Sequence, residues 1–327
     1  MMKKRVKERS AVLLAIALAF SALTYAGAKA ANAVDTSASC SAEIAIGGEF
    51  GELKEVSVPI HLYRVASVEA TGAYVAEEGY ESLDLASVKG DEGSAELWLT
   101  RAAEAAELAK GDEPAVSVKT DGGMAKAENL AAGLYLVMAE DVQSDYYTYS
   151  FTPYLVSLPN NYYELTGDDT WVYDLTGANA IGLKPEQKER TGSLKINKEL
   201  VNHHVTMGEK ATFVFQIDIT ALDGKKESRQ AVLAFDGVGS DSVTISEIPA
   251  GAAVTVTEIY SGAGYRLTAD SAKEQSVTIP ADNTVETAFK NEHDGTPTGG
   301  HGVVNHFELD DNGQYDWSQM KGHGKIQ

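Results

Sequence analysis

Short segments in which apolar and polar residues alternate run through much of the chain. Such alternation is typical of a half-buried β-strand, whose successive side chains point to opposite faces of a sheet. In the first half, four segments rich in Val, Tyr and Leu and bounded by Gly, Asp or Pro predict strands: residues 56–68, 133–140, 149–159 and 170–175. One Ala-rich segment, LTRAAEAAELAKGD, instead predicts a helix near residues 100–110, with Thr100 as its N-cap and Gly111 after its end.

The second half of the chain predicts strands alone. About seven alternating segments follow one another with turn residues between them: residues 193–200, 212–219, 231–235, 242–248, 253–260, 276–280 and 284–291. This many short strands in about 100 residues is typical of an antiparallel β-sandwich of immunoglobulin-like type. The polar stretch KPEQKERTG (residues 184–192) predicts a linker. The sequence therefore predicts a mainly β protein with two tandem, immunoglobulin-like β-sandwich domains, residues 34–188 and 191–294, the first with one inserted helix.

The two ends of the chain differ from the rest. Residues 1–33 combine a basic start, an apolar run and small residues up to Ala33, which is the pattern of a secretory signal peptide. We therefore expect export, cleavage near Ala33, and contact with the membrane only through this signal. Residues 295–327 are rich in Gly, His and Asn and predict either a loose tail or a docking segment.

Composition and charge narrow the class of protein. Hydrophobic residues make up 43% and charged residues 23% of the chain, as in a globular protein. The formal net charge of −21 disfavours binding to nucleic acid or anionic lipid. The single cysteine, Cys40, has no partner for an internal disulfide. It lies well past the apolar run, and the residues before it (SAS) include no apolar one, so the sequence favours a free thiol near a flexible N-terminus over a lipidated cysteine.

Motifs of catalysis are missing from the sequence. The histidines from His203 onward lie in predicted turns or in the tail, without the spacing of zinc ligands. No EF-hand loop, G-x-S-x-G, H-E-x-x-H or phosphate-loop motif occurs. The sequence therefore predicts no metal, no cofactor and no enzymatic turnover.

Three polar residues lie in line with the apolar side chains of their predicted strands: Lys198, Glu258 and Asn291. Each is near a strand end, and each alone could extend its polar group to water. Buried together, they would persist only by satisfying one another, because a lone buried charge is costly.

A lysine amine, a side-chain amide and a carboxyl group are the reactants for an intramolecular isopeptide bond. Burial favours the uncharged amine and the uncharged acid. In the predicted reaction, protonated Glu258 donates a hydrogen bond to the Asn291 side-chain carbonyl and polarises it. The Lys198 amine attacks that carbon, Glu258 transfers the proton, and ammonia leaves.

The segments SLKINKEL, FVFQI, VTVTEIYSGAGY and TAFKN resemble the isopeptide-linkage domains of pilins and the B-type collagen-adhesin repeats of Gram-positive surface proteins. The resemblance covers residues 192 to about 294. It implies a bond between a lysine of the first strand and an asparagine of the last, with a glutamate of a middle strand as catalyst. Those positions are Lys198, Asn291 and Glu258.

The first half is more loosely similar to the first domain of pilin subunits, through KTDGGMAKAENLAAGLYLVMAE and YSFTPYLVSLP. Glu140 falls one position late for a catalytic role, on the opposite face of its strand, and no lysine stands in an early strand. A second cross-link is therefore not predicted. Lys184 in GLKPE is the candidate for the pilin lysine to which a sortase joins subunits, although it precedes the proline instead of following it. A solvated linker lysine is the other interpretation.

The resemblance implies an exported structural subunit of a Gram-positive pilus or surface fibre, whose partners are other pilin or surface-protein subunits and a sortase. The C-terminal residues contain no L-P-x-T-G motif and no apolar span, so we expect a secreted or cell-surface protein without a covalent wall anchor of its own. The alternative is a secreted adhesin that binds a host or matrix ligand. An adhesin should expose an aromatic patch, for which the Tyr-rich residues 145–156 and 160–165 are the candidates if they do not pack within the fold.

Overall fold

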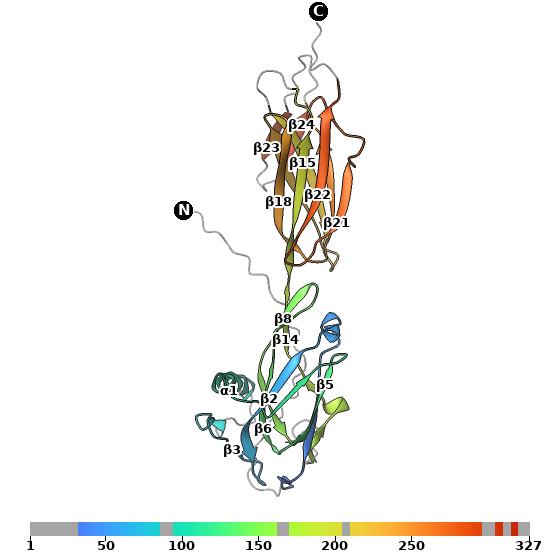
Figure 1. Cartoon of the computed structure of the whole chain (residues 1–327). Coiled ribbons are helices and arrows are strands. Elements are labelled where there is room, and N and C mark those ends of the chain that lie inside the picture. Colours follow the sequence, from blue (N-terminus) through green and yellow to red (C-terminus); the bar gives the residue numbers. More distant parts are fainter. Residues whose placement is uncertain are drawn as a thin grey trace, which may run out of the picture. The chain divides into compact units, whose positions relative to one another are not determined.

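The computed structural model describes residues 32–85, 94–161, 170–204, 210–295, 305–309 and 315–319. The chain divides into two compact units, Met1–Lys188 and Glu189–Gln327 (Figure 1). Both are built mainly of β-strands, which confirms the predicted fold class. The predicted signal peptide lies almost wholly outside the described residues. Among those residues, no helix has the length and apolar character needed to cross a membrane.

The first unit contains a five-stranded sheet in the order β3-β2-β6-β9, with β4 also paired to β2. Its strands are β2 (Pro59–Val68), β3 (Tyr74–Ala76), β4 (Val116–Lys119), β6 (Gly133–Ala139) and β9 (Tyr154–Leu158). A second sheet has the order β12-β1-β13, with β5 also paired to β1. Its strands are β1 (Cys40–Ala45), β5 (Met124–Leu130), β12 (Asp174–Leu175) and β13 (Ile181–Gly182). Apolar residues of β1, β2, β5 and β6 form one buried core.

Smaller elements complete the first unit. They are β7 (Val142–Gln143), β8 (Tyr147–Phe151) and β14 (Pro185–Glu189), which form a three-stranded sheet, the pair β10 (Asn160–Asn161) and β11 (Trp171–Val172), and the 3-10 helices Glu52–Glu55 and Gly177–Asn179. The α-helix is α1 (Ser94–Leu108).

Helix α1 contacts β6 and β9 of the five-stranded sheet. Its small residues Ala102, Ala105 and Ala106 recur at helical spacing and pack with Leu134 and Leu136 in a second core. Strand β6 is therefore buried on both faces, and this explains why GLYLV is a continuous apolar run and does not alternate.

The predicted N-cap of the helix was wrong. Thr100 lies inside α1, where its hydroxyl donates a hydrogen bond to the carbonyl of Glu96 at 2.9 Å. The helix extends toward the N-terminus because Trp98 continues the buried stripe one turn before Ala102.

Residues 184–192 contain the division between the two units, and they are built largely of strands. Most of them lie in β14, which pairs with β8, and β15 (Thr191–Leu200) begins two residues later. The side chains of β14 are largely exposed, so this strand depends on backbone hydrogen bonds and leaves no apolar alternation in the sequence.

Cys40 is a free cysteine at the first position of a strand. It is buried in β1 within the first core, and burial raises its pKa to about 11. A protonated, inaccessible thiol is a packing group, not a reactive one.

The second unit is a sandwich of two four-stranded sheets, in the orders β18-β15-β22-β20 and β17-β16-β19-β21. Its further strands are β16 (Ala211–Thr220), β17 (Lys226–Phe235), β18 (Gly239–Pro249), β19 (Ala253–Tyr260), β20 (Tyr265–Leu267), β21 (Glu274–Thr278) and β22 (Thr284–His293). The first strand β15 and the last strand β22 are parallel neighbours. The core lies between the sheets and includes Leu194, Phe213, Val256 and Phe289. Within residues 295–327, β23 (Asn305–Leu309) and β24 (Tyr315–Gln319) form an antiparallel pair.

We propose that the two units are separate domains, because the buried apolar cluster of the second unit is formed entirely by residues 194–289. A fragment of residues 189–295 should then fold alone. We expect its amides in β15 and β22 to be protected from hydrogen exchange as in the full chain. An unprotected fragment would show that the second unit depends on the first.

Gly192, at the start of β15, is required by close packing. A Cβ atom at this position would lie 2.0 Å from the carbonyl oxygen of Pro280 and 2.8 Å from the Ile279 side chain. Gly192→Ala should therefore destabilise the second unit by about 1–3 kcal/mol, as overpacked sites do. Chemical denaturation, monitored by hydrogen exchange of the amides in β15, measures the change in the free energy of unfolding. Gly237→Ala, where a Cβ meets nothing within 4 Å, is the matched control; equal stability of the two variants would contradict the expectation.

Candidate functional site: a buried Lys–Glu–Asn triad

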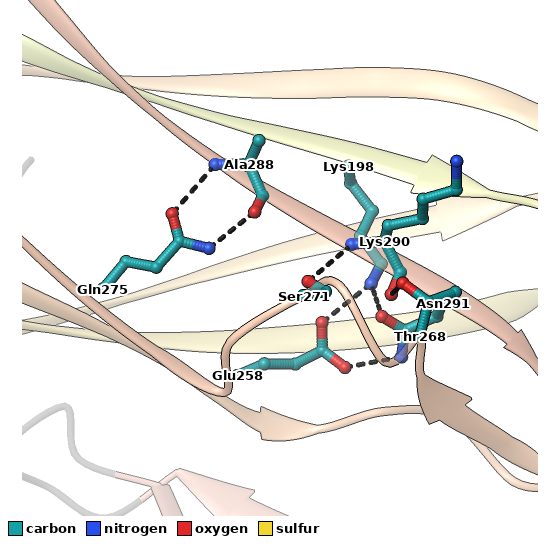
Figure 2. Close-up of polar contacts among 8 residues, drawn as sticks. All are labelled: Lys198, Glu258, Thr268, Ser271, Gln275, Ala288, Lys290 and Asn291. Carbon is teal, nitrogen blue, oxygen red and sulfur yellow. Dashed lines mark hydrogen bonds and ion pairs between the residues drawn. The ribbon is translucent and has the colours of Figure 1, made fainter.

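The structure brings Lys198, Glu258 and Asn291 together inside the second unit. Lys198 is on β15 and Asn291 on β22, where Lys198 stands opposite Phe289 and Leu200 stands opposite Asn291. The lysine and asparagine are therefore diagonal neighbours on the inner face of one sheet. Glu258 reaches them from β19 in the facing sheet (Figure 2).

The three side chains form a closed set of hydrogen bonds. The Lys198 ammonium donates to Glu258 Oε2 at 2.7 Å and to Asn291 Oδ1. The Asn291 amide nitrogen donates to Glu258 Oε1 at 2.7 Å. Lys198 and Glu258 are each 1% exposed and Asn291 is 0% exposed, so water does not compete with these bonds.

The surroundings of the lysine are apolar and aromatic. Its Nζ lies 4.2 Å from the ring centroid of Phe213 and 5.9 Å from that of Phe215, and the Phe289 ring packs 5.1 Å from Phe215. Burial lowers the pKa of Lys198, while the hydrogen bond and charge of Glu258 act in the opposite direction. The net lowering favours the uncharged amine, which is the nucleophilic form.

The amide of Asn291 is oriented differently from the sequence-based expectation. Its nitrogen, and not its oxygen, faces Glu258. This follows from the available partners, because ammonium and amide N–H groups only donate, and the carboxylate and the amide oxygen only accept. Glu258 thus contacts both nitrogens that exchange a proton when the amine displaces ammonia.

Sequence reasoning missed the aromatic wall. Phe213 and Phe215 lie on the inner face of β16 and Phe289 lies two residues before Asn291, so alternation could have identified them. Their role was missed because an inward Phe is otherwise ordinary core packing.

The other candidate residues lie in the first unit. Lys184 is half-buried, with its Nζ 4.8 Å from the ring centroid of Tyr154, and burial lowers its pKa, so it is not a fully solvated linker lysine. Glu140 is exposed, and its carboxylate accepts a hydrogen bond from His61 Nε2 at 2.9 Å. Within the described ranges, no group of three or more His, Cys, Asp or Glu residues is arranged to hold a metal ion.

The Tyr-rich residues 145–156 pack within the first unit. Tyr149 and Tyr154 are buried, and Tyr146 and Tyr147 are half-buried. Residues 162–165 of the second Tyr-rich run lie outside the described part of the chain.

Comparison with known proteins gives a family model and a set of solved structures. The model of a domain of unknown function, DUF5979, matches residues 194–294, a range that contains all three residues of the triad. No curated protein matches the chain.

Gram-positive pilins and adhesins recur among the solved structures to which the chain is similar. The minor pilin GBS52 of Streptococcus agalactiae is 18% identical, with 80% of this chain and 100% of that chain covered and a TM-score of 0.25. The TIE protein of Bacillus anthracis is 14% identical, with 85% and 40% covered and a TM-score of 0.33, so this chain spans less than half of it. A Mobiluncus mulieris adhesin containing disulfide, isopeptide and ester cross-links is 14% identical, with 72% and 84% covered and a TM-score of 0.26.

The lowered pKa of Lys198 gives a testable pH dependence when the asparagine is removed. In Asn291→Ala the amine has no amide to attack and stays ionisable. Between the lowered pKa of the folded state and the ordinary value of 10.5, the unfolded state binds more protons, so the free energy of unfolding should rise with pH. The slope should reach at most about 1.4 kcal/mol per pH unit.

Urea denaturation of Asn291→Ala from about pH 7 to pH 10 measures this slope. The double variant Asn291→Ala, Lys198→Met removes the titrating amine and should lose the rise. Identical pH dependence in the two variants would show that the Lys198 pKa is not lowered in the folded protein.

Proposed function

We propose that Lys198 and Asn291 join in an autocatalytic isopeptide bond, with Glu258 as the catalyst. We further propose that the protein is an exported structural subunit of a Gram-positive pilus or surface fibre. The observation that supports the bond most directly is the closed hydrogen-bonded triad, with all three side chains at most 1% exposed.

The proposed reaction balances without any co-reactant. Glu258 Oε2 takes a proton from the Lys198 ammonium and leaves a neutral amine. The amine Nζ attacks Cγ of Asn291, and a new Nζ–Cγ amide bond forms as the Cγ–Nδ2 bond breaks. The carboxyl group delivers this proton to Nδ2 and then takes the second proton from the attacking Nζ, so that Nδ2 leaves as ammonia and Glu258 ends protonated. Contact of the Lys198 nitrogen with the amide of Asn291 supplies the proximity that such an attack requires.

The place of the bond in the fold suits a structural subunit. It would join the first and last strands of the sandwich and close a loop of 93 residues. By analogy with a disulfide across a loop of similar length, chain entropy alone should stabilise the folded state by about 4 kcal/mol. Because β15 and β22 are parallel, tension applied at the two ends of the domain would pass through the bond and not through the intervening strands.

The fibre role also rests on the sequence, through the signal-peptide pattern of residues 1–33 and the resemblance of residues 192–294 to pilin isopeptide-linkage domains. In this proposal the partners are other pilin or surface-protein subunits. Lys184 is the candidate for sortase attachment, and it would have to leave its half-buried position beside Tyr154 to react. The adhesin alternative gains no support from residues 145–156, whose tyrosines pack in the fold.

Intact mass spectrometry tests the bond. The exported protein should weigh one ammonia less than its processed sequence, and digestion should give a peptide pair joined through Lys198 and Asn291. Glu258→Ala should have the full sequence mass, because no group remains to transfer the proton. Glu286→Ala, which removes an outward carboxylate bonded to Lys195 and Asn197, is the matched control and should still lose ammonia. A wild-type protein at full sequence mass would overturn the proposal.

A further inference from the structure

Residues 268–273 connect β20 to β21, and together with the first two residues of β21 they form a segment, residues 268–275, that lies beside the triad (Figure 2). Strand β20 pairs with β22 only as far as Leu267, opposite Asn291. Beyond that point no strand of the described residues extends this sheet past the edge of β22, although Lys290 and Ala288 still carry backbone groups that need partners.

Gln275 takes the place of a strand at this edge. Its side-chain nitrogen donates to the Ala288 carbonyl at 2.5 Å, and its side-chain oxygen accepts from the Ala288 N–H at 3.2 Å. Gln275 belongs to β21, in the sheet that carries Glu258, whereas Ala288 belongs to β22 in the sheet that carries Asn291. One amide therefore joins the two sheets.

The rest of the segment binds Lys290, the residue directly before Asn291. The Lys290 N–H donates to Ser271 Oγ at 3.0 Å, and the Lys290 carbonyl accepts from the Thr268 N–H at 3.0 Å and from its hydroxyl at 3.2 Å. Both backbone groups of this residue are thus held by one short loop.

The same segment also binds the strand that carries the proposed catalyst. The backbone N–H of Glu258 donates to the carbonyl of Lys273 at 3.0 Å, one residue beyond the last registered pair of β19 and β21, Thr257 with Glu274. The segment is therefore bonded to Glu258 itself on one side and to the residue next to Asn291 on the other.

We propose that residues 268–275 are a positioning clamp for the cross-linking reaction, in which Ser271 and Gln275 set the distance between the Glu258 carboxyl and the Asn291 amide. This inference rests on the proposed function. Glu258 and Asn291 come from different sheets, so their separation depends on how the sheets are held at this edge. A shift of about 1 Å in a reacting pair can slow a reaction by about a hundredfold.

The test follows folding and bond formation separately in the full chain. The chain is made by cell-free synthesis with a short isotopic pulse, and samples are taken at intervals. Intact mass gives the fraction of labelled chain that has lost ammonia, and resistance to a brief protease pulse gives the fraction that has folded. The rate of ammonia loss relative to the rate of folding shows whether the reacting groups are correctly positioned in folded chains. A purely structural defect would lower the folded fraction without slowing the reaction of the chains that do fold.

Ser271→Ala and Gln275→Ala should each slow ammonia loss from folded chains by about tenfold to a hundredfold. Ser271→Thr keeps the hydroxyl and should restore the rate. Gln275→Asn keeps the amide but is one methylene shorter, and should remain slow. The matched controls are Ser276→Ala, whose hydroxyl meets Thr255 on the neighbouring strand, and Gln216→Ala, whose amide bonds only Asp218 among side chains. Both should react at the wild-type rate.

The possible outcomes distinguish a failure of the clamp proposal from a failure of the isopeptide-bond proposal. If the wild type loses ammonia and both Ala variants react as fast once folded, the clamp is wrong and the bond stands. If the wild type never loses ammonia, the proposed bond itself fails and the clamp fails with it. If Gln275→Ala does not fold, the comparison of Ser271→Ala with Ser271→Thr still tests the clamp. If Ser271→Thr, which keeps the hydroxyl, does not restore the rate of ammonia loss, the proposal is overturned.

Discussion

A buried lysine sets the strongest constraint on the second unit. An amine placed among Phe213, Phe215 and Phe289 loses its hydration, and leaving it unpartnered would cost several kcal/mol. Glu258 and Asn291 remove that penalty only if three strands from two sheets meet at one point. The parallel neighbours β15 and β22, and the position of β19 across from them, fulfil this condition. The strand order is thus tied to the chemistry of three side chains.

The first unit handles its buried polar groups in another way. Thr120 is buried, and its hydroxyl donates to the carbonyl of Val56 and accepts from the N–H of Val58. Ser157 likewise donates to the carbonyl of Pro159. These are neutral side chains paired with backbone groups, which carry a small desolvation penalty and need no matching residue from a distant strand. A charged triad is a more demanding arrangement. Among the residues that the structure describes it occurs only in the second of these two cores, and this directs attention to a reaction.

The parts of the fold and of the site that could be predicted from the sequence are those that produce a regular alternation of apolar and polar residues. Lys198, Glu258 and Asn291 were found because each interrupts a two-residue alternation, and the strands that carry them were predicted nearly to their ends. Strand β14, within the predicted linker, was missed because its exposed side chains show no alternation. The role of residues 268–275 could not be predicted from the sequence, because a glutamine whose side chain hydrogen-bonds the backbone of another strand has no characteristic spacing. The orientation of the Asn291 amide depends on donor and acceptor geometry that only the assembled site defines.

Bond formation would change the energetics of the core in more than one respect. Before the reaction the site holds two ionisable groups and an amide with no access to water. Afterwards the amine has become part of a neutral amide, so only Glu258 remains ionisable and the desolvation of an ammonium no longer opposes folding. The released ammonia passes into solvent, where dilution disfavours the reverse reaction. The gain in stability should therefore exceed the entropy of the closed loop, because the reaction also removes the buried charge that made the triad necessary.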